Sequence, residues 1–193
     1  TFNTVLQEAL SALSRIYSQL NVVSKIKELT SATNLKLNKK NPPSIVFKKV
    51  SFSYKDKIKA LDNINFSIES GSKVALVGQS GAGKSSIINL ISRFYDPLSG
   101  EIFINQKNLK DINLNSLRDN IALVSQDTII YNKTFSENIR FGNLEAKEND
   151  IIKAAKNAGI HEFINASTDG YNTVLGEGGK NLSGGQRQRI SIA

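Results

Sequence analysis

Cysteine is absent from this chain of 193 residues. Disulfide bonds, cysteine-based zinc sites and thiol catalysis are therefore excluded, and the composition fits a reducing compartment. Long apolar runs are also absent: no stretch reaches the roughly 18 to 20 residues that a membrane-spanning helix requires, and no signal peptide is visible. Histidine occurs once, at His161, which we expect to be a surface residue.

Acidic side chains are outnumbered by basic ones. The chain has 25 Lys and Arg against 17 Asp and Glu, a formal net charge of +8. This balance suits an anionic partner such as a nucleotide, a nucleic acid or an anionic membrane surface. The alternative is an ordinary solvated surface, because the basic residues are scattered. Hydrophobic residues make up 39% of the chain, which is enough for a packed core.

The first 44 residues divide into a helix and a linker. Apolar residues recur at spacings of three and four over residues 2–29, which predicts an amphipathic helix, either continuous or broken near Asn21. This helix is too polar to cross a bilayer, so it either continues a helix that does or packs on a core. Residues 33–44 combine two prolines with several Lys and Asn and show no periodicity, which predicts a linker.

From Ile45 onward the pattern is that of an α/β domain. Alternating or continuous apolar stretches predict strands at 45–54, 63–69, 73–77, 100–106 and 120–126, with a turn at 69–71. The stretch 73–77 is almost entirely apolar, which is typical of a strand buried on both faces. Helical spacing is found at 85–95, 116–120, 135–141, 148–159 and 161–166. The domain should therefore alternate strands and helices, with a helix-rich insert over about 127–182.

Residues 78–85 read GQSGAGKS, which fits the phosphate-loop pattern G-x-x-x-x-G-K-[ST] between an apolar strand and an apolar helix. Glycines let the backbone wrap closely, so that consecutive N–H groups and the start of the following helix face a phosphate. The Lys84 ammonium would contact the β- and γ-phosphates, and the Ser85 hydroxyl would bind Mg²⁺. The predicted nucleotide-binding residues here are Gly78, Gln79, Ser80, Gly81, Ala82, Gly83, Lys84, Ser85 and Ser86.

A second glycine-rich stretch, LSGGQRQRISIA, covers residues 182–193. Ser183, Gly184 and Gly185 precede a helical pattern, so they would present backbone N–H groups and the positive end of a helix to an anion. Arg187 and Arg189 either add positive charge to such a site or are simply exposed.

With this combination the chain resembles the nucleotide-binding domain of an exporter-type ABC transporter, and more loosely the lipid or multidrug exporter group, which includes lipid A exporters. The stretches SGEIFINQKNLKDINLNSLRDNIALVSQD, TFSENIRFGN and GEGGKNLSGGQRQRISIA carry the exporter resemblance. The implied fold is a P-loop NTPase core of the ABC ATPase kind, with an antiparallel β subdomain and a helical insert. The implied domains are an amphipathic helix at 1–32 that continues the last transmembrane helix, a linker at 33–44 and a partial nucleotide-binding domain at 45–193.

The resemblance also implies roles for individual residues. Tyr54 matches the aromatic residue that stacks on adenine. A lone tyrosine at a strand end has the alternative of an edge or core residue, but the motif position favours the adenine role. Gln126 matches the glutamine that contacts Mg²⁺ and relays to the membrane domain, and it would act in catalysis together with Lys84. The signature residues Ser183, Gly184, Gly185 and Gln186 would contact ATP held by the opposite subunit.

The resemblance implies ATP and Mg²⁺ as cofactors. The implied partners are a second nucleotide-binding domain, forming a homodimer, and the transmembrane domain of the same polypeptide, without nucleic acid. The implied location is the cytoplasmic face of a bacterial inner membrane. One departure is the sequence of residues 176–179, where Gly178 stands in place of the arginine that many exporters have.

The Walker B aspartate, catalytic glutamate and switch histidine of the family all follow the signature, and none is found before Ala193. We therefore expect this chain to be a piece of a longer polypeptide, truncated after the signature and unable to hydrolyse ATP alone. Three functions stay open: the ATPase part of an exporter of lipid-like or hydrophobic substrates, a soluble ABC ATPase of chromosome or repair type, and a relic that binds without turnover.

Overall fold

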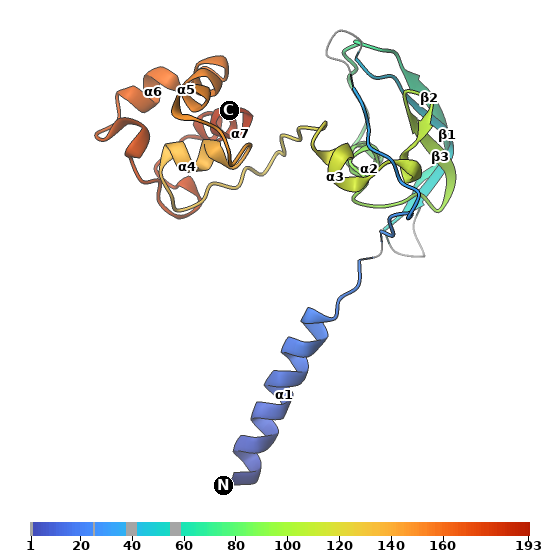
Figure 1. The fold of residues 1–193 in the computed structure, drawn as a ribbon, viewed down its shortest axis with the longest axis horizontal. Coiled ribbons are helices and arrows are strands. Elements are labelled where there is room, and N and C mark those ends of the chain that lie inside the picture. Colours follow the sequence, from blue (N-terminus) through green and yellow to red (C-terminus); the bar gives the residue numbers. More distant parts are fainter. Residues whose placement is uncertain (1, 25, 38–41, 55–58) are drawn as a thin grey trace. The chain divides into compact units, whose positions relative to one another are not determined.

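A computed structural model describes residues 2–24, 26–37, 42–54 and 59–193 of the chain. It divides into two compact units, residues 1–122 and residues 123–193, which are considered separately (Figure 1). The first unit contains the antiparallel sheet and the predicted phosphate loop, and the second contains the predicted signature motif.

The sheet of the first unit has four strands in the order β2-β1-β3-β4, and every pairing is antiparallel. The strands are β1 (Ile45–Ser53), β2 (Lys59–Ile68), β3 (Ser99–Ile104) and β4 (Lys107–Asn108). Phe47, Val50 and Phe52 of β1 are buried. Their spacing is three and then two, because an extra residue in β1 shifts the register against both neighbouring strands. The bulge keeps Val50 on the buried face of the sheet.

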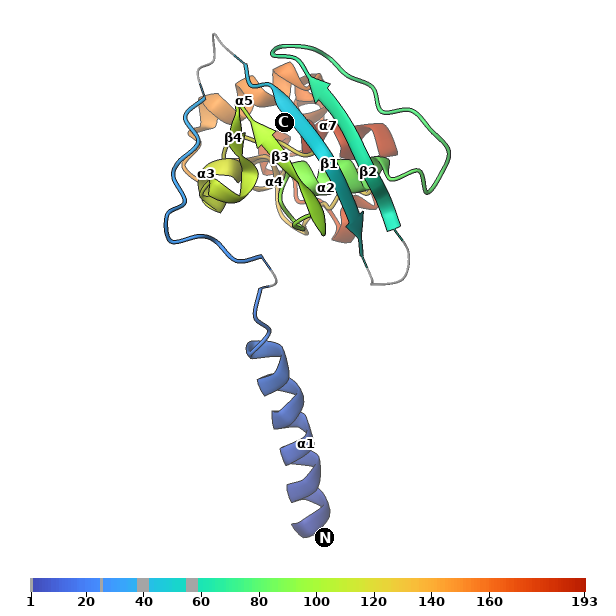
Figure 2. The ribbon, with the colours of Figure 1, turned by 90° about the vertical axis from the view of Figure 1, so that its right-hand side faces the viewer.

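Two helices cover the buried face of this sheet, α2 (Lys84–Ile91) and α3 (Leu114–Arg118) (Figure 2). The short helix η1 (Leu109–Asp111) precedes α3, and Asn113 caps α3 by accepting a hydrogen bond from the Ser116 N–H. Apolar side chains from these elements form one continuous core, made of Leu35, Phe47, Val50, Phe52, Leu61, Leu90, Ile102, Ile104, Leu109, Ile112 and Leu117. This core fixes α2, and with it the phosphate loop, against the sheet.

The amino-terminal helix α1 (Phe2–Leu20) is shorter than predicted and has no buried residue. The helix ends at the break that was one alternative near Asn21, and the continuous helix to residue 29 is wrong. Residues 27 and 33 bond to other parts of the first unit instead. Arg93 donates to the Lys27 carbonyl, and Thr33 pairs with Ile112. No helix in the described part of the chain is long and apolar enough to cross a bilayer.

The predicted linker is in part a packed segment. Leu35 belongs to the core, and its N–H donates to the Ser116 hydroxyl at 2.9 Å. Residues 38–41 of this linker lie outside the described residues. Leu35 thus attaches the Lys- and Asn-rich stretch to the core, in addition to the backbone pairing of Thr33.

The predicted strands at 73–77 and 120–126 are not formed. Both runs are irregular, and within the described residues no strand pairs with either of them. Val77 is 88% exposed, contrary to the expected burial on both faces. An apolar run becomes a strand only where another strand satisfies its backbone groups, so here the sheet contains the antiparallel strands alone. The predicted turn at 69–71 is confirmed, with Gly71 at a φ of 73°.

The second unit is helical and has its own core. Its helices are α4 (Phe135–Arg140), α5 (Glu148–Asn157), α6 (His161–Asn165) and α7 (Gly184–Ile192), joined by the short turns η2 (Gly170–Asn172) and η3 (Glu177–Gly179). Ten buried residues pack between them: Ile130, Phe135, Ile139, Ile151, Ala155, Ile160, Ile164, Leu175, Leu182 and Ile190. The core attaches α7, and therefore the signature residues at its start, to the other helices of the unit.

Candidate functional site

The phosphate loop lies directly before α2 in the first unit. The Lys84 ammonium donates to the Gly78 carbonyl at 2.9 Å and to the Gln79 carbonyl at 2.7 Å, so it is held over the loop. An ammonium has three N–H donors, and within the described residues the third has no partner. The loop thus positions one free donor of a fixed positive charge where an anion can reach it.

Two glycines give the loop its course. Gly81 and Gly83 both have a φ of 83°, a conformation that other residues rarely adopt. A Cβ on Gly83 would lie 2.6 Å from the Ala60 carbonyl oxygen and 2.6 Å from Leu61, whereas a Cβ on Gly81 would meet nothing within 4 Å. Gly83 is therefore required for the loop to approach β2, and Gly81 is required only for its backbone angle.

The first turn of α2 presents its N–H groups without a side-chain cap. Gly83 is the N-cap residue, and the first N–H bonded back to it is that of Ile87, at 3.1 Å. The N–H groups of residues 84–86 precede this bond, which is the usual situation of unpaired donors at a helix start. These donors and the helix dipole make the position suitable for phosphate.

The predicted residues around Lys84 differ in how they can take part. The Ser85 side chain is exposed, so its hydroxyl can serve as an oxygen ligand. The Ser86 side chain is 4% exposed and faces the core, so Ser86 can contribute only its backbone N–H. Gln79, Ser80 and Ala82 lie on the exposed side of the loop. No group of three or more potential metal-ligating side chains occurs in the described part of the chain.

Tyr54 directly follows the last residue of β1, and it is 46% exposed. Its ring meets Phe52 edge-on at 4.8 Å and Tyr95 edge-on at 5.1 Å between centroids. Its hydroxyl accepts a hydrogen bond from the Asn89 amide of α2 at 2.9 Å. The structure therefore joins the predicted adenine residue to the helix that begins at Lys84. Sequence reasoning missed Asn89 and Tyr95, because no local pattern marks contacts across 35 or more positions.

The signature residues form the amino-terminal cap of α7. The Ser183 hydroxyl accepts from the Gln186 N–H at 3.2 Å, and the Gln186 side chain accepts from the Ser183 N–H at 2.7 Å. This reciprocal pair is a capping box, which the spacing S-x-x-Q could have revealed in the sequence. A Cβ on Gly185 would meet nothing within 4 Å, and one on Gly184 would meet only Arg187 at 3.9 Å. The packing of the chain itself does not require glycine at either position.

Arg187 is half-buried and Arg189 is exposed, and both donate to backbone carbonyls. Arg187 donates to the Leu182 carbonyl at 2.7 Å, and Arg189 donates to the Gly159 carbonyl at 3.2 Å. Both guanidinium groups thus brace α7 against the preceding chain.

Two other predictions concern the second unit. Gln126 is exposed near its start. The expectation that His161 is a surface residue is wrong: it is half-buried, and its two ring nitrogens lie 2.8 Å from the Tyr171 hydroxyl and 3.1 Å from the Asn165 amide. His161 therefore has a structural role between α6 and η2.

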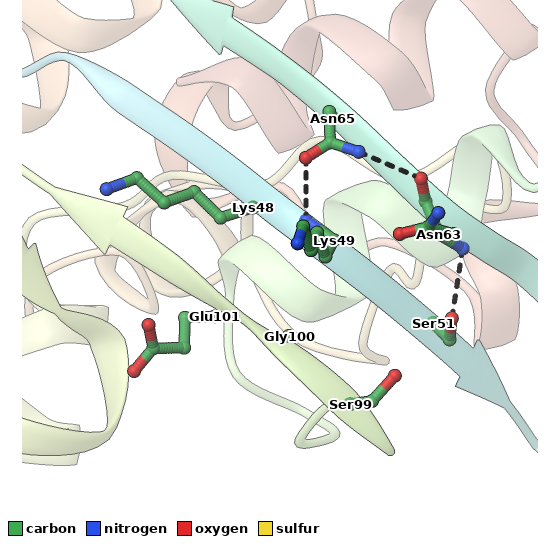
Figure 3. A pocket seen from close by; sticks show the side chains of 8 residues that line it. All are labelled: Lys48, Lys49, Ser51, Asn63, Asn65, Ser99, Gly100 and Glu101. Carbon is green, nitrogen blue, oxygen red and sulfur yellow. Dashed lines mark hydrogen bonds between the residues drawn. The ribbon is translucent and has the colours of Figure 1, made fainter.

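A hollow of about 700 Å³ lies on the sheet, away from the phosphate loop. It is lined by Lys48, Lys49, Ser51, Asn63, Asn65, Ser99, Gly100 and Glu101 (Figure 3). Its polar groups largely satisfy the bulged backbone. The Asn65 side chain accepts from the Lys49 N–H at 2.8 Å and donates to the Asn63 carbonyl at 3.0 Å, and the Ser51 hydroxyl accepts from the Asn63 N–H at 2.9 Å. None of the predicted nucleotide-binding residues lines this hollow. We attribute the hollow to the bulges in the sheet.

With this geometry in view, the chain can be compared with known proteins. The family model described as ABC transporter matches residues 61–193. The ATP-dependent lipid A-core flippase of Syntrophus aciditrophicus (strain SB) is 42% identical over 192 residues, covering 99% of this chain and 31% of its own length. ABC transporter B family member 2 of Dictyostelium discoideum is 48% identical over 152 residues, covering 78% of this chain and 11% of its own length.

The fold is similar as well. The solved structure of a bacterial Atm1-family ABC exporter with ATP bound superposes with a TM-score of 0.88 at 35% identity, covering 96% of this chain and 32% of that one. The chain belongs to the ABC transporter family, and the predicted fold class, an ABC ATPase P-loop fold with an antiparallel sheet, is confirmed. It spans about a third or less of the length of each of these relatives.

Proposed function

We propose that this chain is the ATP-binding part of an ABC exporter, which couples ATP binding and hydrolysis to transport of a lipid-like or hydrophobic substrate. The observation that carries the proposal is the phosphate loop. It holds the Lys84 ammonium on two of its own carbonyls and leaves one N–H free beside the uncapped start of α2.

In this proposal one nucleotide is bound at both of its ends by the first unit. The backbone N–H groups of residues 84–86 and the Lys84 ammonium bind the phosphates, because both supply positive charge at close range. The exposed Tyr54 ring stacks on the adenine. Catalysis in phosphoryl transfer is mainly positioning and charge stabilisation, and Lys84 supplies both.

The residues present also fit a magnesium ion. Mg²⁺ prefers oxygen ligands, and the exposed Ser85 hydroxyl next to Lys84 offers one. Gln126, the other metal ligand that the resemblance implies, is exposed and stays a prediction. Such an ion would neutralise part of the negative charge of a phosphate group. The role of Ser85 is then to fix the ion beside the loop.

The signature motif is proposed to act on a second copy of the domain. Gly184 and Gly185 have open space where a Cβ would stand, so a phosphate can approach the start of α7 closely. Ser183 lies at the same start of α7, where its capping box with Gln186 fixes its position. A homodimer of two such domains, attached to their transmembrane domains at the cytoplasmic face of a bacterial inner membrane, would place each signature at the partner's nucleotide.

The substrate class comes from relatives alone. Several are ATP-dependent lipid A-core flippases with 42% to 43% identity across nearly the whole chain. We therefore propose a lipid-like substrate. In vesicles containing the complete transporter, addition of lipid A should stimulate ATP hydrolysis more than a detergent of matched chain length. Equal stimulation by both would contradict this substrate class.

The nucleotide site is tested by calorimetric titration of the 193-residue chain with ATP. Lys84→Ala should weaken binding by about tenfold to a hundredfold, since a hydrogen bond to a charged group contributes about 1.5–3 kcal/mol. Lys73→Ala, which removes an exposed charge from the same unit, is the matched control and should leave binding unchanged. Equal affinities for the wild type and Lys84→Ala would refute the assignment.

A further inference from the structure

The aromatic ring at the end of β1 is fixed from three sides. The Tyr54 hydroxyl accepts the Asn89 amide hydrogen bond at 2.9 Å, and its ring contacts Phe52 at 4.8 Å and Tyr95 at 5.1 Å. Phe52 is 2% exposed and also contacts Tyr95, at 5.4 Å. An exposed tyrosine would normally sample several side-chain conformations, and these contacts select one.

The fixed ring is attached to the phosphate-binding helix. Asn89 is part of α2, whose first residue is Lys84, so these two side chains are about 1.4 turns apart on the same helix. Tyr95 follows the end of that helix by four positions. Through Asn89, the position of the ring relative to the phosphate loop is thereby tied to α2.

We propose that Asn89 and Tyr95 are positioning residues for nucleotide binding, which hold the Tyr54 ring at the distance from the phosphate loop that one adenine nucleotide spans. This inference rests on the proposed function, because it takes Tyr54 as the adenine-stacking residue. Neither Asn89 nor Tyr95 needs to touch the nucleotide. Their effect is to order the ring before binding, which spares the cost of immobilising a side chain, about 0.5–1.5 kcal/mol or twofold to tenfold in affinity.

A double-mutant cycle isolates the hydrogen bond. Tyr54→Phe removes the hydroxyl and keeps the stacking ring, whereas Asn89→Ala removes the donor. Each should weaken ATP binding by about twofold to tenfold, and the double variant should be no weaker than either single variant, because both break the same bond. Asn115→Ala, an exposed asparagine on α3, is the control and should leave ATP binding unchanged.

A phosphate probe separates positioning from general damage. Inorganic tripolyphosphate has no base, so its affinity should be the same for wild type, Tyr54→Phe and Asn89→Ala. A structural defect in α2 would instead weaken ATP and tripolyphosphate equally. Such an equal loss, or full ATP affinity in Asn89→Ala, would overturn the proposal.

Tyr95 is tested by rescue. Tyr95→Leu removes the ring that packs on Tyr54 and should lower ATP affinity severalfold without changing tripolyphosphate affinity. Tyr95→Phe keeps the ring and should restore the wild-type value. If Lys84→Ala weakens ATP binding while the Asn89 and Tyr95 variants bind normally, the positioning role is refuted and the proposed function stands. If Lys84→Ala also binds normally, the proposed function fails with it.

Discussion

Replacing Gly83 with alanine should destabilise the first unit far more than the same replacement at Gly81. The two glycines have the same φ of 83°, so alanine pays the same conformational cost at both, about 1–2 kcal/mol. Only at Gly83 does the new methyl group collide with the fold, 2.6 Å from the Ala60 carbonyl oxygen. Overpacking of this kind costs about 1–3 kcal/mol more. The two variants should therefore differ in their free energy of unfolding by about 1–3 kcal/mol.

The assay is urea denaturation followed by far-ultraviolet circular dichroism. Hydrogen exchange of the β1 and β2 amides assigns the loss to the first unit. Gly81→Ala should lower the free energy of unfolding by about 1–2 kcal/mol, and Gly83→Ala by about 2–5 kcal/mol. Equal losses, or a larger loss for Gly81→Ala, would refute the steric reasoning. The pair is matched because both residues belong to the same loop.

Three further predictions concern other parts of the chain. Gly185→Ala should leave the melting temperature unchanged or raise it, since the Cβ has open space and alanine favours a helix by up to about 1 kcal/mol over glycine; a lower melting temperature would contradict this. The pKa of Glu137 is lowered from 4.5 to about 2, mainly because its carboxylate accepts a hydrogen bond from the Thr134 N–H. The ionised Glu137 therefore stabilises the fold above pH 4.5, and this stabilisation is lost as the pH falls toward about 2. Glu137→Gln should therefore melt below the wild type near neutral pH and converge with it near pH 2; a constant gap would contradict the shift. Arg93→Lys should destabilise the first unit by about 2–4 kcal/mol, because lysine lacks the planar fork of donors with which Arg93 holds residues 27 and 109–112. Amide exchange at Thr33 and Leu35 should then accelerate. Unchanged exchange at these two residues would contradict the role of Arg93 in holding this segment.

The role of Arg93 follows from its burial. It is 1% exposed, it pairs with Asp96 at 3.0 Å, and it donates to the carbonyls of Leu109, Ile112 and Lys27 at 3.2 Å each. Carbonyls from two segments far apart in the sequence, at residue 27 and at residues 109–112, thus converge on one guanidinium group. Arginine suits this position because its five donors point in fixed directions.

The sequence could predict the local parts of this molecule. Strands β1, β2 and β3, the helices of the second unit and the phosphate loop follow from periodicity or from a motif whose chemistry depends on neighbouring residues. The two-residue strand β4 was not predicted. The α7 cap was also readable, since Ser183 and Gln186 have the spacing of a capping box. Such features are set by contacts within a few positions, which a single sequence records.

Long-range contacts explain the differences. The run 73–77 has the composition of a buried strand, but a strand also depends on a partner, and none pairs with it in the described residues. The helical pattern continues past Asn21, yet residues 27–35 gain more from bonding to Arg93 and Ile112. In the candidate site, Tyr54 was identified by its motif position, whereas its hydrogen bond to Asn89 joins residues 35 positions apart.

The central claim is that the phosphate loop of the first unit is where this chain binds ATP. Amide chemical shifts in a titration of the isotopically labelled 193-residue chain with ATP and Mg²⁺ test it most directly. The largest changes should occur at residues 78–86 and at Tyr54, and they should disappear in Lys84→Ala. Changes centred instead on Lys49, Asn65 and Gly100, which line the hollow on the sheet, would contradict the claim and place the anion site elsewhere.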